Sequence, residues 1–116
     1  MSDLSPQPAL EGAAKRRSQR VLLSMPVDVV WDTGAGVRVR EQGQTEVVSR
    51  HGALLKMETT LPASTQVDIL RPSIGSAARA RVVLATERGR DGMVRIAVEL
   101  ANPRADFWSI GLPLGN

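Results

Sequence analysis

The sequence of 116 residues contains no cysteine, no tyrosine, a single histidine and only three aromatic residues, Trp31, Phe107 and Trp108. Without cysteine the chain has no disulfides and no thiol chemistry. Protein zinc sites usually draw on several cysteine or histidine ligands, so the lone His51 argues against a metal centre and is interpreted as an exposed loop residue. The scarcity of aromatic residues also counts against single-stranded nucleic acid as a partner, because its bases commonly stack on aromatic side chains.

Long apolar runs are missing as well. The run Val21–Leu23 is short and is soon followed by Pro26, whereas spanning a bilayer needs about 20 apolar residues. No secretory leader is recognisable, so we expect a cytoplasmic protein without membrane insertion. No pair of carboxylates, cluster of metal ligands or glycine loop for phosphates rises above background. The sequence therefore favours a binding protein over an enzyme, without a resident cofactor.

What the chain does have is a basic arm, Lys15–Arg20, in which four of the six residues are cationic and none is acidic. Guanidinium groups resist burial but bind phosphate well, because their planar fork pairs two oxygens at once. The formal net charge is only +3, which points to a small anionic partner rather than to long nucleic acid. Two alternatives stay open for the arm. One alternative to a small anionic ligand is that the arm is a solvated tail without a ligand. The other is that it binds RNA or DNA weakly and non-specifically, with steep salt dependence.

Apolar residues recur with a period of two through most of the chain after the arm, which indicates β-strands with one wet face. The strands are expected at 27–31, 37–40, 44–48, 53–58, 67–70, 78–84 and 93–100. The dipeptide Asp91-Gly92 predicts a hairpin turn before the last of them. Residues 1–14 lack periodicity and are expected to form a disordered tail. The pattern predicts one all-β domain over 15–116, a small antiparallel barrel or sandwich.

Two finer expectations concern side-chain direction and the C-terminus. Alternation places the arginines of the strands on their solvent faces and points four residues of one strand inward: Ala78, Ala80, Val82 and Leu84. The dipeptide Asn102-Pro103 can cap and begin a helix, so a short C-terminal helix is predicted over 105–110. Its Phe107-Trp108 pair is expected to plug one end of the barrel.

Two short motifs flank the first strands. Arg16 and Arg20 form the pattern RxxxR, and about thirty residues later Ser49 and Gly52 form the pattern SxxG ahead of an apolar segment. Together with the late hairpin, this arrangement resembles the PilZ domain, a bacterial receptor module for the second messenger cyclic di-GMP. The resemblance covers roughly 15–110. It implies a six-stranded antiparallel β-barrel with a flexible N-terminal arm that grips the ligand, usually a stacked dimer, against the barrel.

Carried over by position, the resemblance implies five ligand-binding residues: Arg16, Arg17, Arg20, Ser49 and Gly52. The arginines would contact phosphates and guanine, the serine would bond phosphate or base, and the glycine would allow a close approach or a special backbone shape. Ligand binding would order the arm and change the surface that a separate, unidentified effector protein meets.

The family pattern has Asp or Asn where this chain has Val47. Val47 cannot accept a hydrogen bond from guanine. The neighbouring Glu46 would point to the opposite face of its strand unless a β-bulge re-aims it. An alternative is therefore a PilZ-like protein-interaction module that has lost ligand binding.

Overall fold

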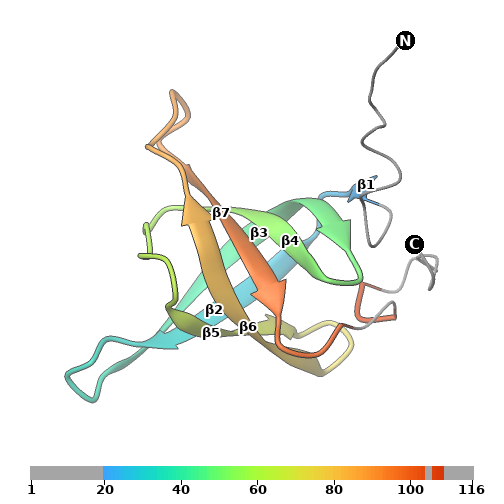
Figure 1. Cartoon of the computed structure of the whole chain (residues 1–116), viewed down its shortest axis with the longest axis horizontal. Helices are drawn as coiled ribbons and strands as arrows, with labels where there is room; N and C mark the ends of the chain where they lie inside the picture. Colours follow the sequence, from blue (N-terminus) through green and yellow to red (C-terminus); the bar gives the residue numbers. More distant parts are fainter. Residues whose placement is uncertain (1–19, 104–105, 109–116) are drawn as a thin grey trace, which may run out of the picture.

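The computed structural model describes residues 20–103 and 106–108 and is all-β over them. Its strands are β1 (Val21–Leu22), β2 (Pro26–Asp32), β3 (Arg38–Ser49), β4 (Gly52–Met57), β5 (Gln66–Arg71), β6 (Ser76–Ala85) and β7 (Val94–Leu100). Strands β2 to β7 form a closed antiparallel barrel in the order β3-β2-β5-β6-β7-β4, and β3–β4 pairing closes it. Strand β1 lies outside this ring and pairs with β3 (Figure 1). In the part of the chain described, no helix is long and apolar enough to cross a membrane.

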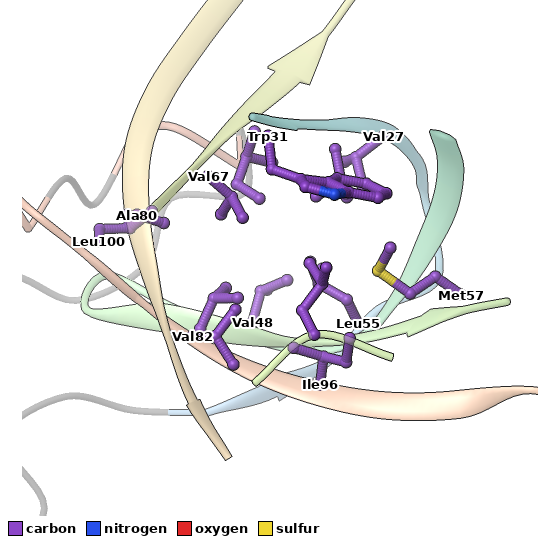
Figure 2. Close-up of a cluster of buried hydrophobic side chains, with 14 of the residues drawn as sticks. Val27, Trp31, Val48, Leu55, Met57, Val67, Ala80, Val82, Ile96 and Leu100 are labelled. Carbon is purple, nitrogen blue, oxygen red and sulfur yellow. The ribbon is translucent and has the colours of Figure 1, made fainter. Parts of the chain in front are cut away.

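The interior of the barrel is filled by the alternating apolar residues that the period of two predicts. Figure 2 shows side chains from several strands converging on this interior, with Trp31 and Val27 on one side and Leu55 and Met57 on the other. Strand β7 follows the prediction closely, because four of its residues are buried in alternation: Val94, Ile96, Val98 and Leu100. Small aliphatic residues, rather than aromatic ones, therefore form most of the core.

One predicted inward residue points the other way. Leu84 is 61% exposed, because the β6–β7 register shifts between Val82 and Leu84. A β-bulge inserts one extra residue, here Val83, and so reverses the alternation beyond it. Sequence alternation alone therefore gave the wrong side for Leu84.

Strand β3 is longer than predicted. The sequence suggests two extended pieces with a bulge or bend at Gln42-Gly43, but β3 runs without a break from Arg38 to Ser49. Gly43 keeps its place in the ladder opposite Val27. The irregularity lies further along, where the β3–β4 register shifts between Thr45 and Val47.

The hairpin between β6 and β7 turns at Asp91-Gly92, as predicted, and Gly92 has a φ of 78°. Near the C-terminus, Asp106–Trp108 form a turn. The other residues of the helix predicted over 105–110 lie outside the described part, and the helix stays a prediction. Trp108 and Phe107 are both buried, with ring centroids 4.8 Å apart at an interplanar angle of 77°. The predicted burial of this pair is thus confirmed.

Candidate functional site

Pairing of β1 with β3 positions the last residue of the basic arm. Val21 lies opposite Val48, and Leu22 lies opposite Val47. Continuing this register by one residue brings Arg20 beside Ser49, and both residues line one hollow in the barrel wall. Arg20 and Ser49 belong to motifs about thirty residues apart in the sequence, and they lie side by side because the two-residue strand β1 pairs with β3.

A buried hydroxyl ties the segment between β1 and β2 to β3. Thr45 has no exposed surface, and its Oγ1 donates to the Leu23 carbonyl at 2.5 Å while accepting from the Met25 N–H at 3.0 Å. The backbone adds two further bonds, Thr45 N–H to the Met25 carbonyl and Leu23 N–H to the Glu46 carbonyl. Sequence analysis missed Thr45. Its only signal is a polar residue at an inward position of a strand, and such a residue needs a buried partner.

The hollow beside Arg20 has a volume of about 430 Å³. Strands β3, β4, β6 and β7 all contribute residues to its wall. It is lined by Arg20, Val47, Val48, Ser49, His51, Gly52, Ala53, Leu54, Val83, Ala97, Val98 and Glu99. The lining thus combines a cation, a hydroxyl and a carboxylate with many apolar groups.

The strand registers arrange part of this surface into an apolar row. Directly opposite residues of neighbouring antiparallel strands share one face of the sheet, and one such series is apolar throughout: Leu22, Val47, Leu54, Ala97 and Leu84. Its two ends are open to solvent, since Leu22 is 84% exposed and Leu84 is 61% exposed. The apolar row therefore crosses the outer wall of the barrel from β1 to β6.

Next to the apolar row runs a polar row formed by Ser49, Gly52, Glu99 and Arg81. The Ser49 hydroxyl accepts from the His51 N–H at 3.2 Å. The Ser49 carbonyl accepts from Trp108 Nε1 at 2.9 Å. These bonds hold the β3–β4 turn in place and leave the hydroxyl proton of Ser49 available to donate.

Gly52 is required by the packing of β4 against β7. A Cβ at this position would clash with the Val98 carbonyl oxygen and lie 3.2 Å from the Glu99 Cα. Both obstacles are backbone atoms, which cannot swing aside as the end of a side chain can. The close approach that the motif glycine permits is thus an approach between strands.

The β-bulge that could re-aim Glu46 is present, but Glu46 already has a partner. Arg95 binds it with two bonds, Nε to Oε1 at 3.2 Å and NH2 to Oε2 at 3.1 Å. Arg95 also donates to Asp91 Oδ1 at 3.1 Å. The hydrogen bond from Arg95, followed by that from the Met93 N–H, lowers the pKa of Asp91, and the bond to Glu46 raises the pKa of Arg95. Glu46 therefore serves a cross-strand ion pair, while Val47 lines the hollow.

The remaining strand arginines lie on the outer wall, as predicted, and most are paired with acids. The pairs include Arg38 with Asp32 and Asp68, Arg40 with Asp28, Arg79 with Asp68, and Arg81 with Glu99. Within residues 20–103 and 106–108, Arg20 has no such acidic partner. Its charge is thus the one in the hollow that is best placed to meet an external anion.

The single histidine differs from its prediction. His51 is half-buried rather than exposed, because its carbonyl accepts from the Leu100 N–H at 2.7 Å and holds the turn against β7. His51 also lines the hollow. No group of three or more potential metal ligands occurs in the part of the chain that the structure covers.

Of the five predicted ligand-binding residues, the structure brings Arg20, Ser49 and Gly52 together. Arg16 and Arg17 lie outside the described residues. Neither a scan against models of protein families nor a search of curated proteins found a match to this chain. A functional assignment consequently depends on the motif spacing and on the geometry of the hollow.

Proposed function

We propose that this protein is a PilZ-like receptor for cyclic di-GMP, a binding protein rather than an enzyme. The observation that supports it is the meeting of Arg20, Ser49 and Gly52 at one hollow, although about thirty residues separate the two motifs in sequence. The spacing alone does not require this meeting. It depends on the β1–β3 pairing and on the tight turn between β3 and β4.

In this proposal the ligand phosphates bind Arg20, with Arg16 and Arg17 supplying further guanidinium groups from the same arm. The Ser49 hydroxyl donates its proton to a phosphate or base oxygen. The apolar row supplies a surface for the faces of the bases. Ligand binding holds the arm over the hollow and thereby changes the surface that a separate effector protein meets. In this proposal the signal passes to that partner.

Calorimetric titration of cyclic di-GMP into the full chain tests the proposal. Hydrogen bonds to charged groups contribute about 1.5–3 kcal/mol, so Arg20→Ala is expected to weaken binding by roughly tenfold to more than a hundredfold. Arg90→Ala is the matched control, because Arg90 is an exposed arginine that does not line the hollow. Its loss removes the same charge and should leave the affinity unchanged.

A double variant, Arg16→Ala with Arg20→Ala, should abolish the heat of binding. If the unaltered protein gives no heat of binding at high ligand concentration, the receptor proposal is wrong. Equal weakening by Arg20→Ala and Arg90→Ala would instead show that only general charge attraction is at work.

The apolar row favours a second candidate function, a PilZ-like module that binds protein only. Val47 belongs to this row, and Leu22 and Leu84 leave its ends open to solvent. A photo-crosslinker placed at Leu84 would then capture a partner that one placed at Arg79 would not, since Arg79 lies in an ion pair away from the row. Such capture, combined with no cyclic di-GMP binding, would favour this candidate.

A further inference from the structure

Guanine needs a hydrogen-bond acceptor that the motif position does not supply. Its Watson–Crick edge presents the N1–H and N2–H donors, which a carboxylate or amide oxygen can accept. At the motif position this chain has the aliphatic Val47, which lines the hollow. Glu46, beside it, is held by two hydrogen bonds from Arg95. An acceptor for the base must therefore come from another strand.

Glu99 of β7 is a carboxylate that lines the same hollow. It belongs to the polar row, where Gly52 separates it from Ser49. Gly52, which has no side chain, places no polar or charged group between the serine hydroxyl and the glutamate carboxylate. The side chain of Glu99 is 45% exposed, so it can reach a ligand in the hollow without first being uncovered.

Arg81 positions this carboxylate. Its NH2 lies 2.6 Å from Glu99 Oε1, and a carboxylate offers about four lone-pair sites in all. One strong bond to Arg81 therefore orients the group and still leaves acceptor sites for a ligand. The arginine charge also offsets the repulsion between a glutamate and the phosphates of an anionic ligand.

We infer that Glu99 is the residue that reads the guanine edge, and this inference rests on the proposed cyclic di-GMP function. Arg20 lies beside Ser49 at one end of the polar row, and Glu99 lies two strands further. The span is three interstrand spacings of about 4.8 Å, or about 14 Å between backbones. An arginine side chain shortens that span, and the remaining distance suits one nucleotide with its phosphate at Arg20 and its base edge at Glu99.

This arrangement sets a preference between bases. Adenine has an acceptor, N1, where guanine has the N1–H donor, so a carboxylate at that edge gains one bond fewer and meets a lone pair. Sites that hydrogen-bond a substrate group discriminate strongly against an analogue that lacks it. Cyclic di-GMP should therefore bind the unaltered protein at least tenfold more tightly than cyclic di-AMP.

Calorimetric titrations of both cyclic dinucleotides into four forms of the full chain test the inference: the unaltered protein, Glu99→Ala, Arg81→Ala and Glu87→Ala. Glu99→Ala should weaken cyclic di-GMP binding by roughly tenfold to a hundredfold and should bring the ratio of the two affinities close to one. Arg81→Ala removes the group that orients the carboxylate but keeps the carboxylate itself, so it should reduce the preference for guanine much less than Glu99→Ala does. Glu87→Ala, in the β6–β7 hairpin, makes the same charge change away from the hollow and should alter neither affinity.

The outcomes separate the inference from the function on which it rests. If the unaltered protein binds neither dinucleotide, the proposed function fails and the inference fails with it. If cyclic di-GMP binds and Glu99→Ala keeps the same preference for guanine, the function stands and the role of Glu99 is overturned. If Arg81→Ala removes the preference as completely as Glu99→Ala does, the ion pair acts through the fold, and base reading by Glu99 is likewise overturned.

Discussion

Replacing Gly52 by alanine should weaken the barrel in the absence of any ligand. The added Cβ would clash with the Val98 carbonyl oxygen, and it would lie 3.1 Å from the Val98 carbonyl carbon. Because these atoms belong to the backbone of β7, β4 and β7 must move apart to relieve the clash. Overpacking of this kind costs about 1–3 kcal/mol and occasionally more.

The adjacent ladder raises the expected cost. The Leu100 N–H donates to the His51 carbonyl at 2.7 Å, one residue from the clash, and its loss adds about 1 kcal/mol. We therefore expect Gly52→Ala to lower the free energy of unfolding by about 3 kcal/mol. For a domain of this size, that corresponds to a fall in midpoint temperature of roughly 10–20 °C.

Thermal and urea unfolding of the ligand-free protein measure this cost. Gly89→Ala is the matched control, because its nearest obstacle is the Asp91 carboxylate oxygen at 3.2 Å, the flexible end of a side chain. That variant should change the midpoint little, since a tolerated Gly→Ala replacement even stabilises by about 0.4–1 kcal/mol. Equal midpoints for Gly52→Ala and the unaltered protein would refute the close β4–β7 approach and return Gly52 to a ligand role.

Three further outcomes are expected. Thr45→Val keeps the side-chain shape but removes the hydroxyl that bonds two backbone groups of the segment between β1 and β2. The free energy of unfolding should therefore fall by about 1–3 kcal/mol, as urea denaturation would show. Val47→Asp adds an acceptor to a hollow in which Glu99 already accepts from the guanine edge, so cyclic di-GMP binding should tighten by less than the roughly tenfold expected for a newly gained hydrogen bond, and a larger gain measured by calorimetry would contradict the role of Glu99. The pKa of Asp91 is lowered by the hydrogen bond from Arg95, so its stabilisation of the β6–β7 hairpin is present above the ordinary value of 3.8 and is lost as the pH falls through the lower folded-state value. The protection of the hairpin amides against exchange, taken relative to the intrinsic exchange rate at each pH, should fall over that acidic range, and this fall should disappear in Asp91→Asn.

Much of the barrel could be predicted from the period of two, because a half-buried strand must alternate apolar and polar residues. Strand β7 is the clearest case, with its alternating buried residues from Val94 to Leu100. The errors arise at β-bulges, where one extra residue reverses the alternation. Leu84 was placed on the wrong face for this reason, and the irregularity of β3 lies at Thr45–Val47 rather than at Gln42-Gly43.

The candidate site could be predicted less completely, because it depends on register between distant strands. The motif spacing identified Arg20, Ser49 and Gly52, but only the fold shows that Gly52 faces a backbone carbonyl. Thr45 and Glu99 belong to no motif. Glu99 lies beside Gly52 because β4 pairs with β7, and no local pattern within either strand encodes that pairing.

The central claim is that cyclic di-GMP binds in the hollow beside Arg20, and backbone amide NMR during a ligand titration tests it most directly. The account predicts that the largest shift changes fall on the amides of the lining residues of β3, β4 and β7, including Ser49, Leu54 and Glu99. The amides around the Arg38–Asp68 ion pair, which is not part of the lining, should change little. Largest changes around that ion pair, or none at millimolar ligand, would contradict the account.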